Sequence, residues 1–323
     1  MQFYKGKHAL ITGVAGFLGS HLADTLLSYG AKVVGIDNFL TGNKDNLSLA
    51  QSKDNFKFLE VDAIKDPTEY LDPEETFDLI FHFASPASPP LYQKYPIETY
   101  LINSLGTHNL LQYMLKAQPL ARFIFASTSE VYGNPSQHPQ TEQYWGNVNP
   151  NGLRSCYDES KRLGETICGV HFRNYNLDIR IVRIFNTYGP RMDPKDGRVI
   201  PDLVMQALQN QPLTVYGDGD QTRSFCYVSD LIQGILLYGS TEYLQGETVN
   251  IGNPNEMTIN SVAEQIKSIT GSASPIEHLA LPADDPVKRK PDISKAKVLL
   301  GWKPEVSFTE GLKKTIEYFT KFL

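Results

Sequence analysis

Two side chains at helical spacing, Tyr157 and Lys161, are suited to moving a proton together. They stand four residues apart in the segment YDESK, so on a helix they share one face. A cation held near a phenol favours its ionised form, and such a tyrosine can accept a proton from an alcohol while hydride leaves the same carbon. The Y-x-x-x-K pattern alone also fits an exposed helical pair, so its meaning depends on the rest of the chain.

A second polar group, STSE at residues 127–130, directly follows an apolar run that predicts a strand over 122–126. In open parallel sheets, ligands bind at the carboxyl ends of the strands. Thr128 and Glu130 are therefore expected to lie near a bound ligand.

A glycine-spaced turn, TGVAGFLG at residues 12–19, lies between a predicted strand and a predicted helix. Such glycines allow a tight turn, close approach of backbone to a pyrophosphate, and close helix–strand packing, while the helix N-terminus attracts the anion. The expected contacts to a dinucleotide are Gly13, Gly16, Phe17, Leu18 and Gly19.

The next predicted strand ends at Asp37, about 20 residues beyond the last glycine. A carboxylate there accepts hydrogen bonds from a ribose 2′-hydroxyl and repels a 2′-phosphate. With no arginine beside it, Asp37 favours NAD over NADP, with Asn38 as a further contact. The alternative, that Asp37 is only a turn residue, does not explain why strand, glycine loop, helix, strand and acid occur in this order.

The predicted elements alternate as βαβ units, which indicates an α/β fold of the Rossmann type: a doubly wound parallel sheet with a smaller C-terminal substrate-binding lobe. We expect residues 1–186 to bind NAD, with about 219–254 returning to that domain, and 187–218 with 255–323 to form the interleaved lobe. Strands are predicted over 8–12, 32–36, 56–61, 78–83, 122–126, 178–184 and 213–216, and helices over 17–29, 97–116, 157–175, 201–209, 262–270 and 309–319, while 228–238 and 248–251 are expected to return to the sheet domain.

Composition excludes several classes of partner. With 30 basic and 36 acidic residues, the 323-residue chain carries a net charge of −6, so its composition does not indicate binding to nucleic acid or to an anionic membrane. No apolar run approaches the ~18 residues of a membrane span. Three cysteines without C-x-x-C spacing predict a cytoplasmic protein rather than a disulfide scaffold, and no metal site is expected.

Taken together, the glycine loop, Asp37, STSE and Y-x-x-x-K resemble the extended short-chain dehydrogenase/reductase superfamily of nucleotide-sugar enzymes. Within it, longer strings resemble the UDP-glucuronate decarboxylases, or UDP-xylose synthases, over nearly the whole chain. These strings are SPASPP (85–90), YWGNVNP (144–150), IFNTYGPRM (184–192) and YGDGDQTRSF (216–225).

The resemblance implies a carboxy-lyase that borrows NAD. Oxidation of the C4 hydroxyl of UDP-glucuronate makes a β-keto acid, which loses carbon dioxide because the C4 carbonyl stabilises the resulting enolate. Protonation at C5 and return of hydride to C4 then give UDP-xylose. Release of the UDP-4-keto-pentose, a nucleotide-sugar epimerase, and a non-catalytic NAD-binding regulator remain alternatives.

By the same resemblance, Tyr157 is the base toward the C4 hydroxyl, Thr128 orients that hydroxyl, and Lys161 lowers the pKa of Tyr157 and holds the nicotinamide ribose. Glu130 is the candidate for proton handling near C5. Arg289 and Ser85 are candidates to hold the carboxylate or assist protonation; for Arg289, a solvated surface charge in the Lys-Arg-Lys triplet is the alternative.

One departure from related families bears on the reaction. Nucleotide-sugar 4,6-dehydratases typically carry Asp-Glu where this chain has Ser129-Glu130, because an acid must expel the C6 hydroxyl; a serine fills that role poorly. Epimerases usually lack an acid at the second position. The pair therefore favours decarboxylation.

For the UDP group, the resemblance points to side chains whose guanidinium forks suit a pyrophosphate, together with neighbours that flank them. Asp62 is a candidate for the adenine side of NAD, with a turn role as the alternative. A homodimer through the helices near 97–116 and 157–175 is also expected. The substrate-binding candidates are Asn186, Arg191, Arg198, Val199, Tyr216, Arg223 and Arg289.

Overall fold

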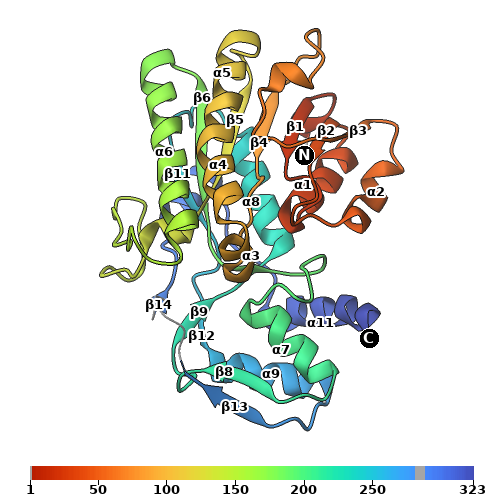
Figure 1. Cartoon of the computed structure of the whole chain (residues 1–323), viewed down its shortest axis with the longest axis vertical. Helices are drawn as coiled ribbons and strands as arrows, with labels where there is room; N and C mark the ends of the chain where they lie inside the picture. Colours follow the sequence, from red (N-terminus) through yellow and green to blue (C-terminus); the bar gives the residue numbers. More distant parts are fainter. Residues whose placement is uncertain (1, 281–287) are drawn as a thin grey trace.

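The centre of the molecule is a parallel sheet of seven strands, in the order β11-β6-β5-β4-β1-β2-β3 (Figure 1). The computed structural model describes residues 2–280 and 288–323. All neighbouring strands pair in parallel. Strands β1 to β6 have the spatial order 3-2-1-4-5-6 of doubly wound dinucleotide-binding folds, which confirms the predicted fold class. The strands are β1 (His8–Thr12), β2 (Lys32–Asp37), β3 (Phe56–Glu60), β4 (Leu79–His82), β5 (Arg122–Thr128), β6 (Asp178–Ile184) and β11 (Thr248–Ile251).

Alternate side chains of the strands enter two separate hydrophobic clusters, one on each face of the sheet. On one face, Ile11 and Phe81 pack with α1 (Phe17–Ser28) and α8 (Val228–Ser240). The opposite face is covered by α4 (Pro96–Leu101), α5 (Thr107–Ala117) and α6 (Ser155–Tyr175); in Figure 1, α5 continues upward from α4, and α6 lies beside the two. The near-continuous apolar strands follow from burial on both faces.

The predicted single helix over 97–116 is divided by a π-helical turn at Ile102–Gly106, between α4 and α5. Apolar periodicity does not predict the π-helical turn, because contacts of Asn103 with distant residues stabilise it. Asn103 Nδ2 donates to Ser85 Oγ and to Ser160 Oγ, each at 3.1 Å, so tertiary hydrogen bonds hold the widened turn. Such turns are frequent at functional sites.

Below the carboxyl ends of the strands lie short helices and small sheets, seen in the lower part of Figure 1. The predicted elements there are confirmed as α7 (Val199–Leu208), β8 (Leu213–Tyr216), α9 (Ile259–Thr270) and α11 (Phe308–Phe319). The other small strands were not predicted, because two to four residues carry little periodicity. They are β7 (Thr187–Tyr188), β9 (Thr222–Ser224), β10 (Cys226–Tyr227), β12 (Glu256–Thr258), β13 (Ile276–Leu279) and β14 (Lys288–Arg289), and the other short helices are α2 (Ser48–Gln51), α3 (Pro89–Lys94) and α10 (Ser294–Leu300).

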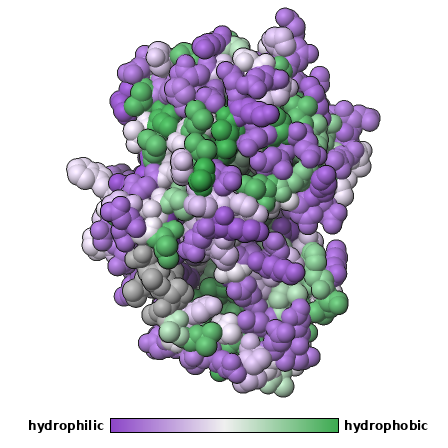
Figure 2. Space-filling view, in the orientation of Figure 1, coloured by the Kyte–Doolittle hydropathy of each residue, from purple (hydrophilic) through white to green (hydrophobic). Residues whose placement is uncertain are grey.

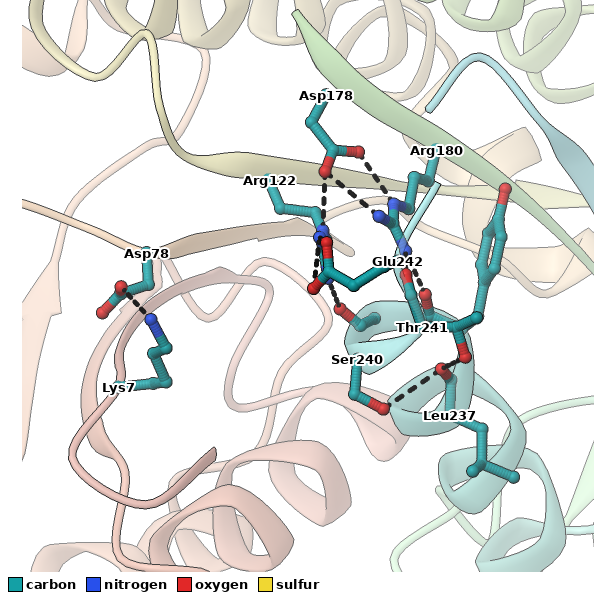
Figure 3. A network of polar contacts seen from close by, with 11 residues as sticks. Lys7, Asp78, Arg122, Asp178, Arg180, Leu237, Ser240, Thr241 and Glu242 are labelled. Atoms are coloured by element: carbon teal, nitrogen blue, oxygen red, sulfur yellow. Dashed lines mark hydrogen bonds and ion pairs between the residues drawn. The ribbon is translucent and has the colours of Figure 1, made fainter. Parts of the chain in front are cut away.

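At the amino ends of β5 and β6, Arg122, Asp178, Arg180 and Glu242 form what we call the staple cluster (Figure 3). Asp178 accepts from Arg122 Nε at 2.7 Å and from Arg180 Nε at 2.8 Å. Arg122 also reaches the half-exposed Glu242, at 3.3 Å. Burial raises the pKa of Asp178, but hydrogen bonds from Arg180 and Arg122 outweigh it and leave that pKa below its usual value.

The same two arginines end helix α8. Arg180 Nη1 donates to the carbonyls of Tyr238 and Thr241, each at 2.6 Å, and Arg122 Nη1 donates to the carbonyl of Gly239. Carbonyls at a helix C-terminus lack intrahelical partners and favour cations. The staple cluster thereby fastens α8 to the sheet.

Within 2–280 and 288–323, no helix combines the length and the apolar character needed to cross a membrane.

Candidate functional site

A cavity of about 1470 Å³ opens where β1, β4, β5 and β6 end, and the lower elements form its other walls. Single ligand pockets typically span ~300–1,000 Å³, so this one has room for a dinucleotide and a second ligand. A smaller pocket beside β2 shares several lining residues with it, including Gly13, Gly16 and Ser85. The position agrees with the rule for parallel α/β sheets.

The glycine loop leaves no room for side chains. At Gly13, which has φ +74°, a Cβ would lie 2.7 Å from the backbone of Ala84, and at Gly19 it would lie 2.1 Å from the Gly13 carbonyl oxygen. The loop leads directly into α1, which starts at Phe17. Bare backbone at a helix N-terminus fits the close approach of a pyrophosphate. Phe17 and Leu18 line the large cavity.

Asp37 lies at the end of β2 and lines the small pocket. Its Oδ2 accepts from the Ala15 amide at 2.9 Å and its Oδ1 from the Phe39 amide at 2.8 Å. Burial raises the pKa of this carboxyl, while these backbone hydrogen bonds lower it. The carboxylate thus ties the glycine loop to β2 and faces the pocket where a ribose fits.

Asn38 and Asp62 line the same small pocket. Each also holds a turn, because Asn38 Oδ1 accepts from the Leu40 amide and Asp62 Oδ1 from the Ile64 amide, both at 3.0 Å. Asp62 thus makes the turn contact of the alternative interpretation and also lines the small pocket, and its contact with the adenine side of NAD stays a prediction.

Tyr157 and Lys161 lie on one face of α6 and are only 6% and 3% exposed, so the exposed-pair interpretation is wrong. Burial raises the pKa of Tyr157 to about 12, although a hydrogen bond with the Thr128 side chain and the charge of Arg198 lower it. Burial lowers the pKa of Lys161 to about 7. Its Nζ donates to the Ala126 carbonyl at 2.7 Å, so the expected effect of Lys161 on Tyr157 stays a prediction.

Glu130 is held between two arginines. Arg154 Nη2 donates to its Oε2 at 2.6 Å, and Arg289 Nη1 donates to its Oε1 at 3.0 Å. Burial alone would raise the pKa of Glu130, but Arg289 and Arg154 bring it down to about 2. Arg289 is 2% exposed and also donates to Ser129 Oγ at 3.0 Å, so the surface-charge alternative is wrong.

Asp158 extends this arrangement behind Glu130. Its Oδ2 lies 3.9 Å from Arg154 Nε, one helical turn away. Burial, and then the charge of Glu130, raise the pKa of Asp158 to about 7. We call Glu130, Arg154, Asp158 and Arg289 the site cluster.

Several buried polar atoms at the site cluster have no hydrogen-bond partner among the described residues. They include Arg289 Nε, Asp158 Oδ1 and the hydroxyl of Tyr92. Tyr92 lines the cavity and stacks on Tyr157, with ring centroids 5.1 Å apart and planes 4° apart. Orphaned buried polar atoms are uncommon and mark a place for a polar ligand.

The sequence analysis missed Tyr92, Arg154 and Asp158. A signal was available for the last two, since they stand four residues apart on either side of Tyr157, at the start of the predicted helix. Tyr92 carried none, because only the fold brings α3 against α6.

The remaining predicted residues line the large cavity, although two arginines pair with carboxylates of the chain itself. Arg191 Nη2 lies 2.5 Å from Asp24 Oδ2, and Arg198 Nη2 lies 2.7 Å from Asp196 Oδ2. Across the part of the chain that the structure describes, no cluster of metal-ligating side chains occurs. The predicted residues in this wall are Ser85, Asn186, Arg191, Arg198, Val199, Tyr216, Arg223 and Arg289.

Comparisons with known proteins agree with this geometry. Residues 10–315 match the family model described as GDP-mannose 4,6 dehydratase. UDP-glucuronic acid decarboxylase 1 of Xenopus tropicalis is 49% identical over 98% of this chain and 73% of its own length. UDP-glucuronic acid decarboxylase 2 of Arabidopsis thaliana is 48% identical over 98% and 68%.

Among solved structures, the UDP-glucuronic acid 4-epimerase of Bacillus cereus in complex with UDP-glucuronic acid and NAD superimposes with a TM-score of 0.88. It is 31% identical and covers 98% of this chain and all of its own. The two comparisons share the fold and the nucleotide-sugar chemistry but carry the names of different reactions.

Proposed function

Because the chain belongs to the UDP-glucuronic acid decarboxylase family, we propose that it is the carboxy-lyase that converts UDP-glucuronate to UDP-xylose and carbon dioxide. The observation that carries this is Arg289, a buried guanidinium beside Glu130 in the cavity wall that Tyr157 also lines. A cation there suits a substrate that brings a carboxylate next to the oxidised carbon.

NAD fits the glycine loop and Asp37. The bare backbone at Gly13 and Gly19 admits the pyrophosphate, and the Asp37 carboxylate accepts from a ribose hydroxyl and would repel a 2′-phosphate. Held by these residues, NAD would supply a hydride acceptor for C4 of the sugar and the hydride that later reduces C4 again. Gly16, Phe17, Leu18, Asn38 and Asp62 complete the proposed contacts.

At the sugar, Tyr157 takes the proton of the C4 hydroxyl, and Thr128, its hydrogen-bond partner, orients that hydroxyl. With a pKa near 12, the tyrosine holds its proton until a nearby cation favours ionisation, and we assign this to Lys161 on the same helix face. Burial of both side chains excludes water from the transfer.

For the second step, Arg289 and Ser85 hold the substrate carboxylate. The C5–C6 bond then breaks, its electron pair passes toward the C4 carbonyl oxygen, and C5 gains a proton. Arg289 and Arg154 hold the pKa of Glu130 near 2, so at neutral pH it acts as an acceptor that positions the water from which C5 takes its proton.

The UDP group occupies the outer part of the cavity, with guanidinium groups on its phosphates. Arg191 and Arg198 exchange their present carboxylate partners for phosphate oxygens, and Arg223 joins them from β9. Asn186, Val199 and Tyr216 flank the nucleoside. We accordingly group residues 187–218 and 255–323 as the substrate lobe, and residues 1–186 with 219–254 as the cofactor domain.

Product analysis after incubation of the NAD-loaded protein with UDP-glucuronate tests this function. UDP-xylose and carbon dioxide in equal amounts support it. A six-carbon product would make the chain an epimerase, and a UDP-4-keto-pentose would mean that re-reduction does not occur before release.

We further propose a homodimer, because large apolar side chains remain exposed on the two helices expected to form it. On α4 and α6, Ile97 is 57% exposed, Leu163 48% and Val170 39%. Figure 2 shows apolar surface gathered over these helices. Contiguous exposed apolar surface marks protein contacts. Light scattering should give twice the chain mass, and Leu163→Arg should give the monomer mass.

The cytoplasm is the proposed location, because Cys156, Cys168 and Cys226 are all free, as in a reducing compartment. Cell fractionation tests this, and recovery in a secretory compartment would contradict it.

A further inference from the structure

We infer that Asp158 takes up a proton when the carboxylate of the substrate binds beside Arg289. The inference rests on the proposed function and names a positioning residue that this function leaves unused. Asp158 is not among the side chains that line the cavity, so it acts through the site cluster and not by touching the substrate.

The ion pairs of the site cluster are shared unevenly. Glu130 has two cationic partners at close range, Arg154 at 2.6 Å and Arg289 at 3.0 Å, whereas the one ion pair of Asp158 among the described residues is with Arg154, at 3.9 Å. A substrate carboxylate beside Arg289 brings a further negative charge close to Glu130 and Asp158. Its entry therefore favours the protonated form of Asp158.

The Asp158 carboxyl is also buried and incompletely hydrogen-bonded. Its side chain is 9% exposed, and its Oδ1 is buried with no hydrogen-bond partner among the described residues, which suits a carboxyl that carries a proton. Its pKa near 7 lets small changes in nearby charge alter its protonation at neutral pH. The charged and titratable groups that face it are Glu130 after β5, Arg154 at the N-cap of α6, Cys156, Tyr157 and Glu159 on α6, Tyr92 on α3 and Arg289 on β14.

Proton uptake at Asp158 matches the change of charge during the reaction. Decarboxylation converts R–COO⁻ and H⁺ to R–H and CO₂, so one proton is consumed for each carboxylate lost. Proton uptake at Asp158 on binding would offset the substrate charge while the carboxylate is present. Loss of neutral CO₂ removes that charge, so Asp158 then returns its proton to solvent, and the proton that C5 gains is a separate one.

Calorimetry of substrate binding can count this proton. The NAD-loaded Tyr157→Phe protein, which blocks turnover, is titrated with UDP-glucuronate in buffers that differ in ionisation enthalpy. UDP-glucose, which has a hydroxymethyl group in place of the carboxylate, is titrated in parallel. We expect UDP-glucuronate to take up ~0.5 proton more per site at pH 7, falling toward zero at pH 5, where Asp158 is already protonated.

Variants assign the proton. Asp158→Asn in the same background should abolish the difference between the two ligands, and Asp158→Ser repeats the test should the first variant not fold. Glu242→Gln is the control, because this carboxylate is 62% exposed and pairs with Arg122 in the staple cluster, away from Asp158, and it should leave the difference unchanged.

Uptake that persists in the Asp158 variants would assign the proton to Glu130 and overturn the inference, as would equal uptake for both ligands in the parent protein. These results are independent of the proposed function, since release of carbon dioxide by the unmodified enzyme is measured separately.

Discussion

Two groups of buried arginines and carboxylates stand at opposite ends of the same strands and differ in what they leave unpaired. In the staple cluster, Arg122 and Arg180 direct their guanidinium groups at Asp178 and at backbone carbonyls of α8. In the site cluster, Arg289 Nε and Asp158 Oδ1 are buried without partners among the described residues.

The carboxyl groups differ in the same way. The pKa of Asp178 is below its usual value, as expected of a carboxylate that is fully paired. In the site cluster, by contrast, the pKa of Glu130 is near 2 and that of Asp158 is near 7. Pairs of acids pushed apart in this way mark functional sites. The same residue types therefore fasten the fold at one end of the sheet and await a ligand at the other.

Replacement of Arg289 should have the largest effect. Arg289→Gln removes the charge that holds the substrate carboxylate, and kcat should fall by ~10²–10³-fold. Steady-state carbon dioxide release measures this, and absorbance of bound NAD checks the cofactor site. A decrease of less than about threefold would place the carboxylate elsewhere.

Replacement of Arg180 tests the opposite prediction. This fully buried side chain holds Asp178 and two carbonyls of α8, so Arg180→Met should lower the free energy of unfolding by ~3 kcal/mol. Denaturant titration measures the loss, and kcat per folded molecule should be unchanged. A strong loss of kcat at full folding would mean that the two clusters are coupled.

The next largest effect is expected in the pH dependence of stability, which should have opposite signs for Asp158 of the site cluster and Asp178 of the staple cluster. The folded pKa of Asp158 is raised, so its burial costs stability as pH rises from ~4 through about 7. Asp158→Asn should therefore gain several degrees in Tm relative to the unmodified protein at pH 8, and gain little near pH 4. A constant difference at both pH values would show that Asp158 does not titrate in the folded protein.

For Asp178 the sign is opposite. Its folded pKa is depressed, so its contribution is present above pH ~4 and is lost as the pH falls through the folded value. Calorimetric scans between pH 5 and pH 3 should therefore show a smaller loss of Tm in Asp178→Asn than in the unmodified protein.

The smallest effect is expected at Glu242, whose side chain is 62% exposed although it pairs with Arg122. Glu242→Gln should change the free energy of unfolding by less than ~1 kcal/mol, because solvent screens exposed pairs. A loss as large as that of Arg180→Met would show that the staple cluster depends on its exposed member.

Local pattern predicted the sheet, the glycine loop and the Tyr157–Lys161 face, because each depends on neighbours within a few residues. The pairing of Arg289 with Glu130 joins residues 159 positions apart. It requires β14 to pair with β9, and a strand of two residues is too short for its pairing to be predicted from the sequence. Burial of Asp158, and hence its raised pKa, likewise depends on packing between distant elements.

The site cluster makes this fold a decarboxylase. The decisive measurement follows the carbon label of UDP-glucuronate that carries ¹³C at C6, incubated with the NAD-loaded enzyme. One labelled carbon dioxide and one unlabelled UDP-xylose should form for each substrate consumed, with no net NADH. Label retained in a six-carbon UDP-sugar would contradict it.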